Sequence, residues 1–279
     1  MTIVRYESPQ EYLQRVGEFL YRAEAENNLI LGIVERLVRE EKTEGEKRWM
    51  LAIEDQGKVV GAAWVSEPRY GLVVTRLPAE VVGELVNYLI REEVPLTGSV
   101  GPGGIPAEIS KLIRERTGRD VSLRFRQRIY RCSEVNHPAG VSGKLREAVE
   151  EELELMKEWS VAFERESGVT SPAGTIEKFV TEEISKRRLF VWDDGGPVSS
   201  AAAFRETRNG ITVVRVYTPE ALRRKGYAAA IVAGLTQLHL ERGKEFCSLY
   251  TDLANPTSNS IYQKIGYVPV CDSEEWRFE

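Results

Sequence analysis

The sequence has few of the residues that build metal centres and disulfide frameworks. Its 279 residues include two histidines, His137 and His239, and three scattered cysteines, Cys132, Cys247 and Cys271. These numbers argue against a histidine-based metal site, a histidine triad and the paired cysteines of a secreted fold. We therefore expect no metal in this protein, and the reducing cytoplasm as its compartment.

Long apolar runs are missing as well. No stretch reaches the roughly 18 apolar residues of a membrane span, and the opening segment MTIVRYESPQEYLQ lacks the regions of a signal peptide. The net charge is −5, whereas a nucleic-acid binder needs a basic surface to neutralise phosphates. We expect neither a membrane nor a nucleic-acid partner.

The length exceeds the usual size of a single domain. A hydrophobic content of 42% with 29% charged residues is ordinary for a soluble globular protein. Turn-forming residues are concentrated in Asn136–Gly140, which marks a linker between Arg131 and Gly143. We therefore predict two domains, residues 1–135 and 140–279.

Hydrophobic periodicity and turn residues predict the same order of elements in both halves. In the first half we expect helices over 9–41, a hairpin of 49–53 and 59–65, a strand over 71–77, a helix over 80–92 and a strand over 97–100 with Gly101–Gly104 as the loop after it. In the second half we expect helices over 143–166 and 175–186, a hairpin of 189–192 and 198–204, and a strand over 211–217. The two hairpins align at an offset of about 140 residues, which indicates an internal duplication.

The stretch VVRVYTPEALRRKGY, residues 213–227, is the most informative part of the chain. A strand ends at Thr218-Pro219, and a loop with Arg223, Arg224 and Lys225 then leads through Gly226 into an alanine-rich helix. The first turn of a helix has free amide donors and favours negative charge, so this arrangement suits an anionic ligand. Taken alone, the stretch also fits an ordinary strand, loop and helix with a solvated basic loop.

A second informative stretch is NPTSNSIYQKIGY, residues 255–267. Asn255-Pro256 predicts the cap and first residue of a helix, which Gly266 ends. One face of this helix packs through Ile261 and Ile265. The other presents polar groups, namely Asn255, Ser258 or Asn259, and Tyr262.

Both stretches resemble motifs of the GNAT superfamily of N-acetyltransferases. The spacing Arg223-x-x-Gly226-x-Ala228 after a strand is similar to the acetyl-CoA pyrophosphate loop of that family. An asparagine seven positions before a tyrosine, followed by Gly-Tyr, is similar to a second family pattern. The resemblance covers residues 140–279. It implies a mixed α/β protein, an α+β mixed sheet with the GNAT fold in two tandem domains. The first copy has lost the arginines after Leu77-Pro78, so we expect it to have lost its acyl-CoA site.

The resemblance also implies roles for particular residues. Acetyl-CoA would be the cosubstrate, with its pyrophosphate on the backbone from Arg224 to Ala228 and the charge of Arg223 and Arg224 nearby. The amide of Val216 would polarise the thioester oxygen. The complete set expected to bind the cosubstrate is Val214, Val216, Thr218, Arg223, Arg224, Lys225, Gly226, Tyr227, Ala228, Asn255, Ser258, Asn259 and Tyr262.

Several side chains are candidates for proton transfer. The phenol of Tyr262 stays protonated at neutral pH and can donate to a departing thiolate, or it can simply pack the helix onto the sheet. Glu206 and Asp252 are candidate general bases, or solvated and capping carboxylates. Cys247 has no evident basic partner and is expected to pack.

The leading hypothesis is therefore an enzyme that transfers an acetyl group from acetyl-CoA to an amine by direct attack in a ternary complex. The acceptor would be a small molecule or a peptide amine, and the protein a monomer or homodimer. The alternative is a non-catalytic acyl-CoA sensor or interaction protein that retains the fold. Tyr262 favours the enzyme, since a sensor has no need of a proton donor.

Overall fold

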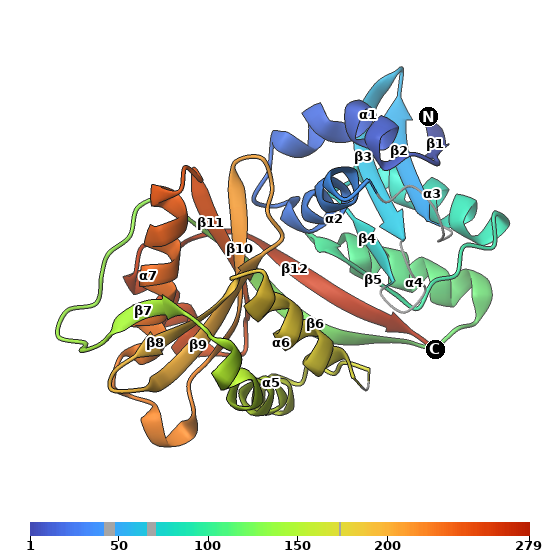
Figure 1. The fold of residues 1–279 in the computed structure, drawn as a ribbon. Helices are drawn as coiled ribbons and strands as arrows, with labels where there is room; N and C mark the ends of the chain where they lie inside the picture. Colours follow the sequence, from blue (N-terminus) through green and yellow to red (C-terminus); the bar gives the residue numbers. More distant parts are fainter. Residues whose placement is uncertain (42–47, 66–70, 173) are drawn as a thin grey trace.

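The two hairpins expected from the sequence form the antiparallel part of each half. In the first, β2 (Trp49–Asp55) and β3 (Lys58–Val65) are joined at Gln56 and Gly57, which both have positive φ, as a tight hairpin turn requires. In the second, β8 (Leu189–Asp193) and β9 (Pro197–Phe204) turn at two glycines with positive φ. The computed structural model, shown in Figure 1, describes residues 1–41, 48–65, 71–172 and 174–279.

The remaining elements occur in the same order in both halves. The first half adds β1 (Thr2–Tyr6), α1 (Pro9–Tyr21), α2 (Asn28–Arg39), β4 (Leu72–Val74), α3 (Ala79–Arg91), β5 (Gly98–Pro102), α4 (Ile105–Thr117) and β6 (Val121–Cys132). The second half adds β7 (Lys144–Glu147), α5 (Leu153–Ser167), α6 (Thr175–Ser185), β10 (Gly210–Tyr217), α7 (Tyr227–Glu241), β11 (Phe246–Asp252), α8 (Pro256–Lys264) and β12 (Val268–Phe278). Short 3₁₀ turns, Glu150–Glu152 and Glu220–Leu222, precede α5 and α7.

The described strands form one mixed sheet in which the two halves exchange strands. The order is β1-β2-β3-β4-β5-β12-β6-β11-β10-β9-β8-β7. Strand β12, from the end of the chain, lies between β5 and β6 of the first half, and β6 pairs in turn with β11 of the second half. Figure 1 shows β6 and β12 running together from one half to the other. Each half is thus completed by a strand of the other.

Helices cover both faces of this sheet in each half. In the first half, α1 and α2 pack on one face around Tyr12, Leu31 and Trp64, and α3 and α4 pack on the opposite face. In the second half, α5 and α6 pack on a cluster with Trp159 and Val191, while α7 covers the opposite face. No helix in the described ranges is long and apolar enough to cross a membrane.

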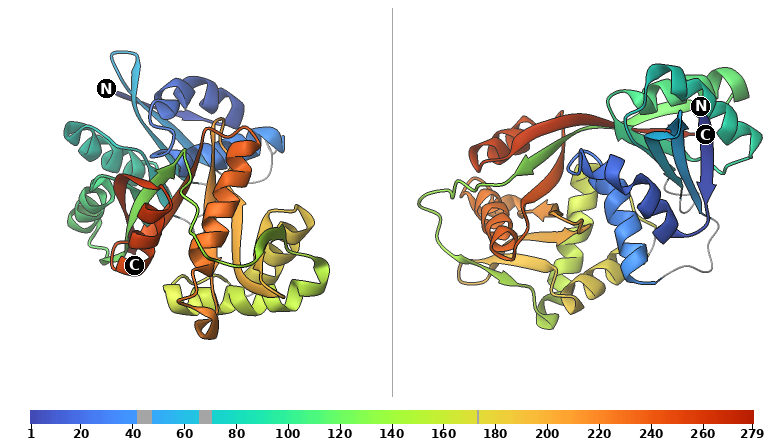
Figure 2. Two further views of the ribbon diagram at one scale, coloured as in Figure 1. Left: turned by 90° about the vertical axis from the view of Figure 1, so that its left-hand side faces the viewer. Right: turned by 90° about the horizontal axis from the view of Figure 1, so that it is seen from above.

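The two halves are joined by polar contacts as well as by strands. The loop between β9 and β10 docks on α1 and α2, where Glu24 accepts hydrogen bonds from the amide and side chain of Asn209, both at 2.8 Å. The Arg208 guanidinium lies 3.8 Å from the ring centroid of Tyr21. Figure 2 shows α1 and α2 next to the second half.

Three sequence predictions of secondary structure were wrong in detail. The helix expected over 143–166 begins only at Leu153, because Lys144–Glu147 pairs with β8 as an edge strand. The strand expected over 71–77 ends at Val74, since the amide of Ala62 donates to the side-chain hydroxyl of Thr75, at 3.0 Å, and not to its carbonyl. The loop expected at Gly101–Gly104 begins only after Pro102, because Gly101 and Pro102 pair with β12.

Candidate active site

Strands β10 and β11 diverge in the middle of the second half. They pair in parallel only from Gly210 to Thr212, opposite Phe246 to Ser248. On its other side β10 stays paired with β9 as far as Val214, and again at Tyr217 after a bulge of one extra residue. Within the described residues, the β10 edge from Val213 to Tyr217 therefore has no strand partner on the β11 side.

The loop after β10 has a backbone suited to an anion. Arg224 and Gly226 have positive φ, of 67° and 87°, whereas the φ of Lys225 between them is not positive. This alternation of the sign of φ is typical of the backbone nests that bind anions. In the described part of the chain, none of the amides of residues 224–229 donates to a protein acceptor. Helix α7 begins directly after Gly226, so its positive end adds to the loop.

The side chains of this loop differ in their contacts and exposure. The Nε of Arg223 donates to the Thr218 carbonyl at 2.9 Å, and its guanidinium pairs with Glu166 on α5, so this arginine fixes the loop. Arg224 and Lys225 are exposed. The buried Tyr227 donates its hydroxyl to Asp194 at 2.6 Å, and so anchors the start of α7 to the β8–β9 turn.

The linker between the halves touches the same loop. Ser142 donates to Asp194 at 2.8 Å, and its carbonyl accepts a hydrogen bond from the Trp192 indole at 2.8 Å. A Cβ placed on Gly226 would lie 2.7 Å from a methyl group of Val141. Gly226 is therefore constrained by this neighbour as well as by its positive φ.

Helix α8 begins as the sequence predicted. Asn255 is its cap and accepts the Ser258 amide at 3.0 Å, with Pro256 in the first turn. Asn259 is engaged within the protein: its amide nitrogen donates to the carbonyls of Asp252 and Asn255, and its oxygen accepts the Tyr130 hydroxyl at 2.9 Å.

Tyr262 lies on α8, where it packs on the buried core of the second half. Its ring centroid is 6.5 Å from that of Tyr130 and 6.1 Å from that of Tyr267. Burial raises the pKa of Tyr262 to about 12, and a hydrogen bond with Ser258 acts against this. The phenol therefore stays protonated throughout the neutral range.

The two candidate bases lie at opposite ends of the parallel strands β10 and β11. Asp252 ends β11 at the same end of the parallel strands as the loop that follows β10, and its carboxylate accepts the Ala254 amide at 2.8 Å. Glu206 lies in the loop that precedes β10, at the far end of that strand. Its side chain pairs with Lys244 at 2.8 Å, and this hydrogen bond lowers the pKa of the carboxyl group. The geometry thus brings Asp252, but not Glu206, to the same end of the strands as the loop.

One group at the point of divergence was not anticipated from the sequence. Asn28, at the start of α2 in the first half, is 1% exposed. Its side chain donates to the Tyr250 hydroxyl at 3.0 Å and accepts from Thr212 at 3.2 Å, and Thr212 bonds to Ser248 at 3.0 Å. Since 184 residues separate Asn28 from Thr212, no local pattern predicts the contact.

A second unanticipated group surrounds the bulge of β10. Arg215, whose φ is 51°, donates to Glu164 of α5 at 2.8 Å. Glu164 also accepts the amide and hydroxyl of Ser171, at 3.1 and 2.6 Å. A charged residue inside the apolar run VVRVY was the signal in the sequence.

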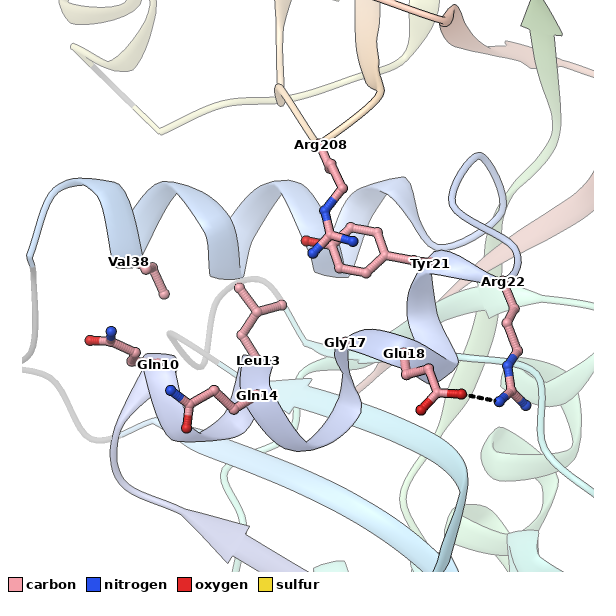
Figure 3. A pocket seen from close by; sticks show the side chains of 9 residues that line it. All are labelled: Gln10, Leu13, Gln14, Gly17, Glu18, Tyr21, Arg22, Val38 and Arg208. Atoms are coloured by element: carbon pink, nitrogen blue, oxygen red, sulfur yellow. Dashed lines mark hydrogen bonds and ion pairs between the residues drawn. The ribbon is translucent and has the colours of Figure 1, made fainter.

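One cavity lies outside this region. A cavity of about 690 Å³ lies between α1 and α2 and reaches Arg208 of the second half. Figure 3 shows this arginine above Tyr21, and the Glu18 to Arg22 ion pair on α1. None of the residues predicted to bind acetyl-CoA lines it. In the described ranges, no group of three or more histidines, cysteines and acidic residues is arranged to hold a metal.

Comparisons with known proteins agree with this architecture. Residues 194–277 match the sequence model of a family described as FR47-like protein. Comparison with curated proteins gives no match. A solved structure of a Drosophila protein is similar with a TM-score of 0.71 and 10% identity, covering 99% of this chain and 98% of that one.

Two further solved structures are described as GNAT proteins. One is an acetyltransferase from the GNAT family of Colwellia psychrerythraea, with a TM-score of 0.57 and 13% identity, covering 100% of this chain and 99% of that one. The other is a tandem GNAT protein from the clavulanic acid biosynthesis pathway, with a TM-score of 0.52 and 12% identity, covering 99% and 97%. At such identities the likeness establishes the fold. The chain therefore has the GNAT fold in two tandem copies, and the second copy contains the FR47-like segment.

Proposed function

We propose that the second half transfers an acetyl group from acetyl-CoA to an amine within a ternary complex. One observation carries this proposal: a loop with free amides and positive φ values follows the strand edge that is left unpaired where β10 and β11 diverge. A pyrophosphate on the amides of residues 224–228 would place the pantetheine arm along Val214, Val216 and Thr218. An extended chain with amide groups can pair with such an edge as a strand does.

The reaction needs a polarised carbonyl and two proton transfers. The neutral amine would attack the thioester carbon, whose oxygen would accept the Val216 amide. The bond between carbon and sulfur then breaks, and the amine loses a proton. Asp252 is the better placed of the two candidate bases, directly or through water, because it lies at the same end of the parallel strands as the loop.

Tyr262 would give its proton to the departing thiolate. With a pKa near 12, the phenol is fully protonated before the reaction, so the proton is available in every encounter at neutral pH. The neighbouring polar groups of α8 would contact the pantetheine amides. Both polar atoms of the Asn259 side chain are bonded within the protein, and the Asn255 oxygen caps α8, so the side-chain nitrogen of Asn255 and the hydroxyl of Ser258 would make these contacts.

The first half differs at the equivalent loop. Between Val74 and Ala79 no described residue has positive φ, and Arg76 pairs with Glu26 at 3.0 Å. A cavity of only about 20 Å³ lies next to β4 and β5, and Ile30 of α2 and Tyr250 of β11 also line it. We propose that this half binds no acetyl-CoA.

The test is acetyl-CoA binding by calorimetry, followed by CoA release with a panel of small amines and peptides. Binding followed by acceptor-dependent release is the expected result. Binding without release for any acceptor would favour the acyl-CoA sensor, and no binding would refute both functions.

A further inference from the structure

Arg215 directly precedes Val216, whose amide we propose to polarise the thioester. Arg215 lies within the β10 bulge. Val216 packs towards the α7 face, whereas Val214 and Tyr217 pack with α5 and α6 on the opposite face. The Arg215 side chain also reaches this second face, where it meets Phe163, Glu164 and Phe179.

The guanidinium of Arg215 is only partly satisfied there. Nη2 donates to Glu164, and the centre of the group lies 4.5 Å from the Phe179 ring centroid. Nη1 is buried and has no hydrogen-bond partner in the described part of the chain. A buried donor without a partner carries a full desolvation penalty, so a further acceptor at this position would be favourable.

Glu164 is not available to supply that acceptor. Although burial opposes its ionisation, the hydrogen bonds from Ser171 and Arg215 lower the pKa of this carboxyl group. It is ionised and already accepts three hydrogen bonds, two from Ser171 and one from Arg215. A planar guanidinium with a free N–H group is suited to a carboxylate.

We infer that Arg215 binds a carboxylate of the acceptor, so that the acceptor is a small primary amine of the amino acid type. This inference rests on the proposed acetyl transfer. A carboxylate held by Nη1 would keep the amino group near the Val216 amide, on the face opposite α7. Arg215 would then determine specificity, without taking part in proton transfer.

The inference is tested with matched acceptors that differ in the carboxylate. Glycine, L-alanine and L-phenylalanine are compared with methylamine, ethylamine and phenethylamine, and with glycinamide. The amine analogues are more basic than the amino acids and glycinamide is less basic, so ionisation alone cannot make both poorer acceptors. We expect kcat/KM for the amino acid to exceed that for each analogue by about 10- to 100-fold, as for the loss of a charged hydrogen bond.

Substitutions test whether Arg215 causes this preference for a carboxylate. Arg215→Lys keeps a charge for Glu164 but has no second nitrogen in the place of Nη1, and the double variant Arg215→Met with Glu164→Gln removes both buried charges. Both should bring the ratio of kcat/KM values close to one. Because each ratio is taken within one protein, a smaller folded fraction does not change it. Arg187→Lys, in an exposed ion pair with Glu147 of the same half, is the control and should keep the ratio.

The binding of glycine and methylamine to the protein with CoA, measured by calorimetry, separates this inference from the proposed function. Glycine binding that depends on Arg215, without CoA release, would refute the transferase and support the site. Equal use of amines with and without a carboxylate, or a preference that survives in both variants, would overturn the inference.

Discussion

The hydroxyl of Tyr262 is the group whose removal best separates an enzyme from a sensor. Tyr262→Phe keeps the ring between Tyr130 and Tyr267, and so most of the packing. If the phenol protonates the thiolate, turnover should fall by about 10²- to 10⁴-fold while acetyl-CoA affinity changes little. Turnover, affinity and melting temperature are measured together.

A neighbouring tyrosine supplies the control. Tyr130→Phe removes a hydroxyl from the same cluster, one that bonds to Asn259 and Gln263. It should lower stability by about 1 kcal/mol without a comparable loss of turnover. A Tyr262→Phe protein with near-normal turnover would remove this residue from the mechanism.

His239 should make stability depend on pH. Burial lowers the pKa of this imidazole to about 4, and its Nε2 has no hydrogen-bond partner in the described residues. The unfolded chain binds the proton near pH 6.5, so the free energy of unfolding should be unaffected above that pH and decrease from pH 6.5 to 4. The decrease due to this group should reach up to about 3 kcal/mol.

Denaturant unfolding of the native protein and of His239→Gln, from pH 7.5 to 4, measures this contribution. Other buried groups titrate in both proteins, so the difference between the two curves isolates His239. The difference should grow as the pH falls. Parallel curves would show that the imidazole is protonated as easily in the folded protein as in the unfolded chain.

The loop before α7 should tolerate no side chain at Gly226. A residue other than glycine is strained at its φ of 87°, and its Cβ would contact Val141. Gly226→Glu should also bring bulk and negative charge to the pyrophosphate. We expect a loss of acetyl-CoA affinity of at least about tenfold, measured by calorimetry.

Two variants separate binding from folding. Gly243 also has a positive φ, of 93°, but no atom lies within 4 Å of its Cβ position, so Gly243→Glu adds similar backbone strain away from the loop. Val141→Ala relieves the contact with position 226. If affinity returns in the protein with both Gly226→Glu and Val141→Ala, the loop is a structural element and not the pyrophosphate site.

The sequence patterns predicted correctly the turns and helix starts that depend on neighbouring residues. The turn between the strands expected over 49–53 and 59–65, the cap at Asn255 and the glycine before α7 were all predicted, because their backbone requirements are set by adjacent residues. The strand Lys144–Glu147 was missed since it is stabilised by pairing with β8 and not by its own pattern.

The contacts around the candidate site could be identified only from the tertiary structure. The pairing of β6 with β11 and the insertion of Asn28 at Thr212 join residues more than 100 positions apart, and many registers satisfy the same apolar pattern. The bulge at Arg215 likewise depends on the pairing of β10 with β9. The sequence could therefore suggest the loop that we propose for the cosubstrate, while the side that we propose for the acceptor could be identified only from the fold.

The whole chain should bind a single acetyl-CoA. The loop of the second half has two residues with positive φ, Arg224 and Gly226, whereas no described residue between Val74 and Ala79 of the first half has a positive φ, and Arg76 there pairs with Glu26. Calorimetric titration should give one site per chain, and Arg76→Ala should leave both the number of sites and the affinity unchanged. Two equivalent sites would contradict the loss of function in the first half.

The exchange of β6 and β12 has a consequence for the synthesis of the chain. A ribosome delivers β5 and β6 long before β12, which lies between them in the finished sheet. Until Val268–Phe278 emerges, the nascent chain has open strand edges on both sides of the gap, and such edges invite wrong pairing. The exchange also makes the second half depend on the first, which supplies β6, the strand between β11 and β12.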